Sequence, residues 1–180
     1  CTLIVSEQRK DNLRQAHLWT HTLREYSQNA KGPELFVLSV PEWPENEKQV
    51  LCFPDQGLTV ILGIDYVGEV KMGFLRMAMW EAKQEGMLSL HAGSKILMAN
   101  RPDGSTGKQG MLLFGLSGTG KTTHSCHDHG LVSDGEGIDV LQDDIVFLGK
   151  DGSAKGTERG FFLKTEGLEA DTQPLICNAL

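Results

Sequence analysis

The chain has 180 residues, a length that suits one ordinary domain or one domain and part of another. Hydrophobic residues make up 39% of it, which excludes global disorder, because disorder requires low hydrophobicity together with high net charge. The net charge of −7 argues against a nucleic-acid partner, which would call for a basic surface, but it leaves room for a local basic pocket that binds a small phosphate ligand.

The sequence shows no sign of a membrane span or of secretion. Its longest apolar runs, residues 58–64 and 111–116, are far shorter than the roughly 20 residues of a membrane helix. The 4 cysteines are scattered without disulfide or metal-ligand spacing, so we expect a cytoplasmic protein. The chain lacks an initiator Met and its last residues read like a helix cut short, which predicts a piece of a longer protein.

The first half of the chain alternates between strand and helix patterns. Short apolar runs predict strands at residues 3–5, 35–40, 49–53 and 58–62. A first helix is expected from Asp11 to the Gly-Pro pair that follows residue 31, with an apolar face of Leu13, Ala16, Leu23 and Tyr26. A second helix is expected over residues 67–85, with an apolar stripe of Val70, Phe74, Met77 and Ala78.

The second half of the chain predicts more strand than helix. Strands are expected at residues 87–91, 95–99, 111–114, 140–142, 145–148 and 161–164. A polar loop is expected over residues 100–109, and the Lys-Asp-Gly-Ser stretch at 150–153 is typical of a hairpin turn. The two halves together predict a mixed α/β fold.

A glycine-rich turn follows the apolar run at 111–114. Residues 115–122 match G-x-x-x-x-G-K-[ST], in which glycines let backbone N–H groups converge on phosphate oxygens. The lysine adds a positive charge for the outer phosphates, and the hydroxyl after it can bind Mg²⁺. The predicted nucleotide-binding residues here are Gly115, Leu116, Ser117, Gly118, Thr119, Gly120, Lys121, Thr122 and Thr123. The alternative is a chance match in a glycine-rich hairpin, which the preceding strand pattern disfavours.

Two adjacent carboxylates, Asp143 and Asp144, follow the next apolar run. This placement resembles a Walker B element, which holds the metal of a bound triphosphate. A charged surface turn is the alternative, and the upstream lysine loop favours the metal role.

Five potential metal ligands also follow the glycine-rich turn, namely His124, Cys126, His127, Asp128 and His129. Their spacing fits no standard zinc pattern, and no second ligand cluster completes a tetrahedral site. We therefore expect a short helix and a turn in this segment.

Five segments together resemble the ATP-dependent phosphoenolpyruvate carboxykinases. They are residues 66–71 (Tyr-Val-Gly-Glu-Val-Lys), 90–94 (Leu-His-Ala-Gly-Ser), 115–123, 143–144 and 158–165. The GTP-dependent relatives carry a cysteine-bearing loop where this chain has its glycine-rich turn, so the resemblance is to the ATP class.

The resemblance implies an α/β fold with mixed sheets and a P-loop nucleotide-binding core. Residues 1–95 would be the end of a substrate-side domain and residues 96–180 the start of the nucleotide-binding domain. Members of the family convert oxaloacetate and ATP reversibly to phosphoenolpyruvate, ADP and CO₂ in gluconeogenesis, and they use Mn²⁺ and Mg²⁺. Family members are much longer than this chain, so we expect the 180 residues alone to be inactive.

The resemblance also implies metal ligands. His91 and Asp144 would bind the catalytic Mn²⁺, and Thr122, with Asp143 nearby, would bind the Mg²⁺ of MgATP. Imidazole and carboxylate suit Mn²⁺. Taken alone, a histidine in an apolar strand is more often a core residue, so the metal role depends on the combined motifs.

The same resemblance assigns residues to the nucleotide and the substrate. Lys121 would hold the β- and γ-phosphates, Glu158 would contact the nucleotide side, and Tyr66 would lie at the substrate carboxylate. Lys71 would carry charge for substrate or metal, although a lone lysine in a helix is more often solvated.

One position departs from the family pattern. The family has two successive lysines in the substrate segment and the second is a metal ligand, whereas this chain has Lys71 followed by Met72. A thioether does not replace an amine on a hard cation. Three accounts stay open: Lys71 supplies the amine, which we favour, water fills the vacancy, or activity is impaired.

Two other functions stay open at this point. One is another P-loop kinase, such as an enzyme that phosphorylates a protein serine, which would not need Tyr66, Lys71 and His91 together ahead of the loop. The other is a nucleotide sensor or scaffold that has lost its metal ligand at Met72.

Overall fold

The computed structural model describes residues 1–6, 9–22, 31–116, 118–142, 144–159 and 174–177. The chain divides into two compact units, one made of Cys1–Ser89 with Gly149–Asp151 and the other of Leu90–Leu148 with Gly152–Leu180. The units contain separate sheets, of four and five strands, together with helices. The predicted mixed α/β fold is therefore confirmed. None of the described helices is long and apolar enough to cross a membrane.

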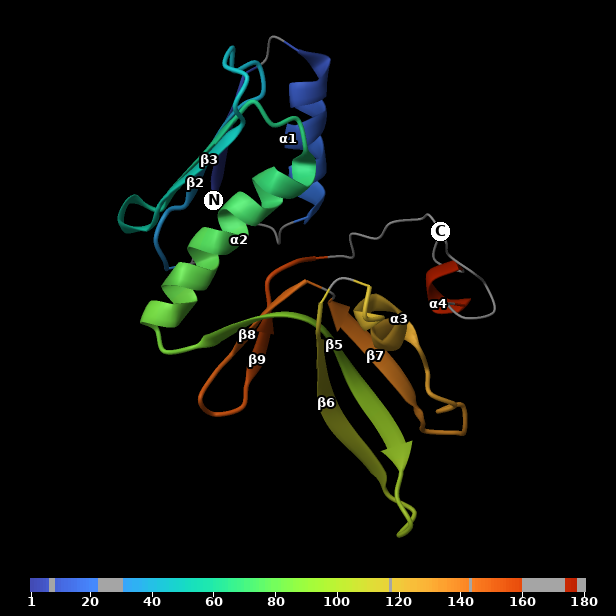
Figure 1. Cartoon of the computed structure of the whole chain (residues 1–180). Helices are drawn as coiled ribbons and strands as arrows, with labels where there is room; N and C mark the ends of the chain where they lie inside the picture. Colours follow the sequence, from blue (N-terminus) through green and yellow to red (C-terminus); the bar gives the residue numbers. More distant parts are fainter. Residues whose placement is uncertain (7–8, 23–30, 117, 143, 160–173, 178–180) are drawn as a thin grey trace. The chain divides into compact units, whose positions relative to one another are not determined.

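The first unit is a four-stranded sheet with two helices packed on it (Figure 1). Its strands are β1 (Thr2–Val5), β2 (Phe36–Val40), β3 (Gln49–Phe53) and β4 (Leu58–Leu62), in the order β1-β2-β4-β3. Its helices are α1 (Lys10–Thr22), α2 (Val67–Gln84) and the single 3₁₀ turn η1 (Pro54–Gln56). The strands β1, β2 and β4 run parallel and β3 is antiparallel to β4, so the sheet is mixed.

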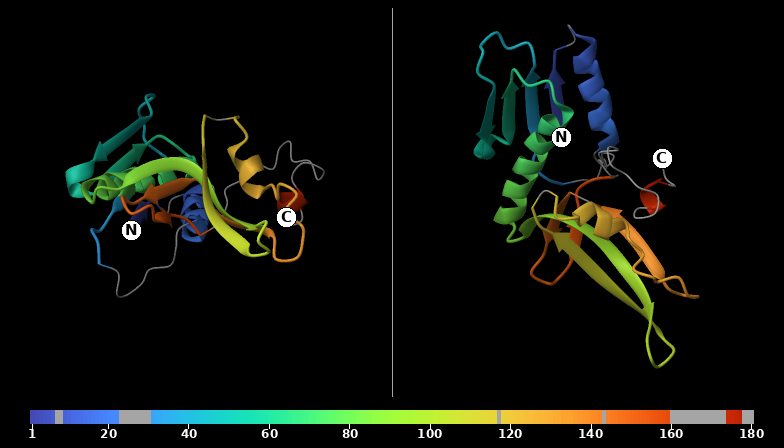
Figure 2. Two further views of the ribbon diagram at one scale, coloured as in Figure 1. Left: turned by 90° about the horizontal axis from the view of Figure 1, so that it is seen from below. Right: turned by 45° about the vertical axis from the view of Figure 1, so that its right-hand side comes forward.

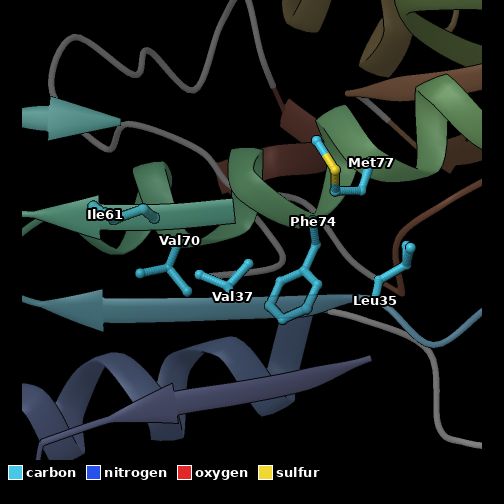
Figure 3. Packing of buried hydrophobic residues seen from close by; sticks show 6 residues of the cluster. All are labelled: Leu35, Val37, Ile61, Val70, Phe74 and Met77. Carbon is cyan, nitrogen blue, oxygen red and sulfur yellow. The ribbon is translucent and has the colours of Figure 1, made fainter. Parts of the chain in front are cut away.

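The core of the first unit lies between α2 and the sheet. Val70, Phe74 and Met77 are buried on one side of α2, which confirms the predicted apolar stripe. They pack with Leu35, Val37 and Ile61 from the sheet side (Figure 3). A Cβ atom on Gly73 would lie 3.1 Å from Val37 Cγ2, so the helix can approach the sheet this closely only where its side chain is a hydrogen atom.

The buried face of α1 differs from the predicted one. Leu13, expected in the core, is 55% exposed, whereas Gln15 is buried and donates a hydrogen bond from Nε2 to Asp65 Oδ1 at 2.9 Å. Trp19 stacks on Phe74 of α2 with ring centroids 5.0 Å apart. A polar side chain is buried at little cost when a distant loop supplies its partner, and the local apolar pattern contains no information on that partner. Leu23 and Tyr26 lie outside the described residues.

The second unit is a five-stranded sheet with short helices. Its strands are β5 (Leu88–Asn100), β6 (Thr106–Phe114), β7 (Gly137–Gln142), β8 (Ile145–Leu148) and β9 (Ala154–Gly156). Its helices are α3 (Lys121–Cys126) and α4 (Pro174–Cys177). The order is β6-β5-β8-β9, and β7 also pairs with β5.

The strand limits predicted in this unit were wrong in two places. The strands predicted at 87–91 and 95–99 are one continuous strand, β5, and residues 106–109, predicted as loop, belong to β6. The antiparallel ladder runs from Ala92–Phe114 to Asn100–Thr106 without interruption. Backbone hydrogen bonds to a neighbouring strand hold glycine and polar residues in a ladder whatever their propensity. The hairpin predicted at 150–153 is confirmed, because it joins β8 to β9, and the strand predicted at 161–164 lies outside the described residues.

Candidate active site

The glycine-rich turn joins the end of β6 to the start of α3. Gly118 and Gly120 have φ values of 79° and 85°, in the left-handed region that favours glycine. A Cβ atom on Gly115 would lie 2.7 Å from Thr119 Oγ1, and this hydroxyl donates a hydrogen bond to the Leu116 carbonyl at 2.7 Å. The turn is therefore folded tightly on itself. Ser117 lies outside the described residues.

The side chain of Lys121 reaches back over this turn. Its ammonium group donates hydrogen bonds to the carbonyl oxygens of Gly115 at 2.9 Å and Leu116 at 3.1 Å. Thr122 and Thr123 follow it in the first turn of α3 and are half-buried. The positive charge of Lys121 and the hydroxyl groups of two threonines thus lie at the start of α3, directly after the glycine-rich turn.

His91 and Asp144 form a pair at the surface of the second unit. His91 Nε2 lies 3.4 Å from Asp144 Oδ1, and the two side chains are 63% and 15% exposed. His91 is therefore no core histidine, although its position in an apolar strand favours that interpretation when it is taken alone. Among the described residues, no group of three or more His, Cys, Asp and Glu side chains is placed to hold a metal ion, and Asp143 lies outside those residues.

The strand register brings this pair to the glycine-rich turn. Ala92 pairs with Phe114, the last residue of β6 before the turn, so His91 lies beside the beginning of the turn. The backbone N–H of Ala92 donates to the carbonyl oxygen of Asp144 at 2.7 Å, which brings Asp144 to the same place. Helix α3 lies at the end of the β5–β6 ribbon where β6 ends (Figures 1 and 2).

A buried glutamine next to the two adjacent carboxylates in the sequence, Gln142, connects several segments of the second unit, and the sequence analysis did not single it out. Gln142 is buried, its Nε2 donates to the carbonyl oxygen of Ile145, and its Oε1 accepts from the backbone N–H of Glu158 at 3.0 Å. Thr157 Oγ1 donates to the same Ile145 carbonyl at 2.9 Å. These bonds tie the ends of β7 and β8 to the segment after β9. The only sequence signal for Gln142 is a polar residue at the end of an apolar run.

The residues expected at the substrate belong to the first unit. Tyr66 precedes the first residue of α2 and is 65% exposed, and Lys71 on the same helix is only 7% exposed. The expectation that a lone helical lysine is solvated therefore fails for Lys71. Met72 is half-buried. The structure thus places Tyr66 and Lys71 in one unit and His91, Lys121 and Asp144 in the other.

Comparison with known proteins matches nearly the whole chain to one family of enzymes, the phosphoenolpyruvate carboxykinases. The family model described as phosphoenolpyruvate carboxykinase, in its ATP form, matches residues 3–180. The chain belongs to this family, the ATP-dependent phosphoenolpyruvate carboxykinases.

Individual relatives agree with the family match. The chain is 50% identical over 136 residues to a phosphoenolpyruvate carboxykinase (ATP) of Aeropyrum pernix, an alignment that covers 75% of this chain and 27% of the relative. It is 31% identical over 158 residues to a phosphoenolpyruvate carboxykinase (ATP) 2 of Salinibacter ruber, covering 82% of this chain and 26% of the relative. A phosphoenolpyruvate carboxykinase (ATP) of Zea mays is 34% identical over 123 residues, and this alignment covers 67% of this chain and 16% of the relative. The chain thus spans about a quarter of the length of the first two relatives.

Proposed function

We propose that the full-length protein converts oxaloacetate and ATP reversibly to phosphoenolpyruvate, ADP and CO₂ in the cytoplasm. The observation that carries the proposal is the position of the His91–Asp144 pair beside the beginning of the glycine-rich turn. A phosphate-binding element and a pair of metal-ligand side chains at one strand end suit transfer of a phosphoryl group. In this proposal the second unit begins the nucleotide-binding domain, with a P-loop core, and the first unit ends the substrate-side domain.

The turn residues 115–123 would bind the phosphates of ATP. Lys121 would exchange its two carbonyl partners for β- and γ-phosphate oxygens, which attract the ammonium group more strongly because they are charged. Thr122 and Asp143 would hold the Mg²⁺ of MgATP, and Glu158 would contact the nucleotide side. Backbone N–H groups of the turn would supply the remaining donors.

The donor set of the His91–Asp144 pair fits Mn²⁺. A neutral imidazole and a carboxylate are ligands that Mn²⁺ accepts, and the largely exposed imidazole leaves room for other ligands. A divalent cation bound there would stabilise the negative charge of the enolate that remains when oxaloacetate loses CO₂. Tyr66 would orient the substrate carboxylate and Lys71 would supply a positive charge to the substrate or metal. The enolate oxygen would then attack the γ-phosphorus, and ADP would leave with the electron pair of the broken P–O bond.

The test is a coupled assay of the full-length protein with oxaloacetate and MgATP. His91→Gln should lower kcat/KM by about 100-fold or more, because a metal ligand contributes several kcal/mol to the transition state. His17→Gln, on the exposed side of α1, is the matched control and should leave activity unchanged. Wild-type protein that produces no phosphoenolpyruvate, or equal activity in both variants, would refute the proposal.

Met72 supports a second candidate, a nucleotide-binding relative without catalysis. The methionine stands where the family has the lysine that binds the metal, and its thioether does not bind a hard cation. Titration of the intact protein with Mn²⁺ distinguishes the two candidates. Mn²⁺ binding with turnover supports the enzyme, whereas MgATP binding with neither Mn²⁺ binding nor turnover supports the non-catalytic relative.

A further inference from the structure

A buried lysine lies behind the helix that carries Lys121. Lys95, in the middle of β5, has no solvent exposure. Its ammonium group donates to the carbonyl oxygens of His124 and His127, the latter at 3.0 Å, and lies 2.7 Å from His129 Nε2. An ammonium group has three donors, and these three acceptors use all of them. The charge is therefore buried with its hydrogen bonds complete.

The conformation of the turn after α3 brings the imidazole of His129 to the ammonium group of Lys95. His129 has a φ of 58°, the only non-glycine residue of the described chain in the left-handed region. Its backbone N–H donates to His127 Nδ1 at 2.8 Å, and the backbone N–H of Gly130 donates to Asp128 Oδ1 at 2.9 Å. A strained backbone held by several local bonds indicates that the position of the imidazole matters.

The charge states of Lys95 and His129 are consistent with a hydrogen bond between them. Burial lowers the pKa of His129, and the nearby Lys95 lowers it further, so the imidazole is neutral and its Nε2 accepts from the ammonium group. Burial also lowers the pKa of Lys95, against which Cys126 and Asp128 act in the opposite direction. Because His129 Nε2 faces the ammonium group, this ring has no free lone pair there for a zinc ion.

Helix α3 needs support from outside itself. It has 6 residues, and an isolated helix of this length is unstable in water. Lys121 and Thr122 occupy its first turn, whereas the carbonyl groups bound by Lys95 belong to its last turn and to the residue after it. A cation at the C-terminal end of a helix also interacts favourably with the helix dipole.

From this arrangement we infer that Lys95 is a positioning residue, which fixes the C-terminal end of α3 and thereby places Lys121 and Thr122 for the phosphates of ATP. The inference rests on the proposed function for the identity of the ligand. The same strand carries His91 four residues earlier, so β5 supports both the candidate metal ligand and the helix of the phosphate-binding turn. Between the pairs Ser94–Gln142 and Lys95–Val140 the β5–β7 register also shifts, a local irregularity that can re-aim a side chain.

The experiment compares Lys95→Met with Lys108→Met in the full-length protein. Lys108 is an exposed lysine on β6 of the same unit and serves as the control. A hydrogen bond to a charged group changes an equilibrium by about tenfold or more, so Lys95→Met should reduce hydrogen-exchange protection of the α3 amides by about that factor. It should raise Kd and KM for MgATP by about tenfold and leave KM for oxaloacetate within about twofold. The control should change none of these quantities.

A folded Lys95→Met protein with unchanged α3 protection or unchanged MgATP affinity would overturn the inference, and so would equal rises in KM for both substrates. Should this variant fail to fold, His129→Ala, which removes one acceptor, decides the question by the same two measurements with smaller shifts. Lys95→Arg keeps the charge and should restore part of the MgATP affinity. A wild-type protein that produces no phosphoenolpyruvate refutes the proposed function, whereas exchange and MgATP binding still decide the role of Lys95.

Discussion

The conformation of Gly120 allows a direct test of the proposal that the glycine-rich turn binds phosphate. Its φ of 85° and ψ of 19° lie in the left-handed region, directly before the first residue of α3. Alanine at this conformation costs about 1–2 kcal/mol. A Cβ atom there would meet nothing closer than His124 Cδ2 at 3.5 Å, an ordinary contact, so the cost of Gly120→Ala is conformational and not steric.

Gly104 provides a control with the same cost and no role in the turn. It has a φ of 83° in the connection between β5 and β6, and a Cβ atom there would meet no atom within 4 Å. We expect Gly120→Ala and Gly104→Ala to lower the free energy of unfolding equally, by about 1–2 kcal/mol. Only Gly120→Ala should weaken MgATP binding. The alanine relieves its strain when the backbone dihedral angles change, and this change turns an N–H group of the turn away from the phosphates.

The assay is calorimetric titration of both full-length variants with MgATP, together with their melting temperatures. Loss of one hydrogen bond to a charged phosphate corresponds to about a tenfold rise in Kd. If the two variants bind MgATP with Kd values within about twofold of each other, the assignment of the turn to phosphate binding is wrong.

Three further predictions address the rest of the structure. Gly73→Val should loosen α2 from the sheet by about 1–3 kcal/mol in hydrogen exchange, because its Cβ atom would already crowd Val37 on β2 and Thr59 on β4, whereas Gly110→Val has open space around it and should change little. Lys71→Ala in the full-length enzyme should lower kcat/KM substantially, and a loss within about twofold, below ~0.4 kcal/mol, would contradict its role. Because the pKa of His129 is lowered from the usual histidine value of 6.5, the unfolded chain at a pH just below 6.5 binds a proton that the folded chain does not. Stability should thus be full above that pH and fall below it, and His129→Asn should flatten the drop in melting temperature between about pH 7.5 and 5.5.

The sequence supplied candidate residues for the site but not the buried residues that hold the surrounding segments together. The glycine pattern, His91 and the acidic pair were all found as motifs, because phosphate and metal ligands require particular residue types at particular spacings. Lys95 and Gln142 were not singled out, although both are buried and each hydrogen-bonds two or more groups of the second unit. Their partners are backbone groups and a histidine up to 34 residues away, and no local pattern marks such a relation.

At several positions the tertiary fold, and not the residue type, determines whether a side chain is buried. Lys71 is buried and His91 is exposed, the reverse of what each suggests when read alone, and on α1 Gln15 is buried whereas Leu13 faces solvent. Whether each of these side chains is buried depends on which other segment of the chain packs against it. Hydrogen bonding compensates the burial of Gln15, which the apolar periodicity of a helix does not register.

Sequence alone determined that the chain is a mixed α/β protein of this family, with strands and helices largely where their periodicity and glycine breaks placed them, because these signals are local. The tertiary structure decided that β5 is one long strand, that its register brings His91 to the glycine-rich turn, and that Lys95 reaches the end of α3. Pairing between strands and burial of charge depend on segments far apart in the chain, so only the folded arrangement determines them.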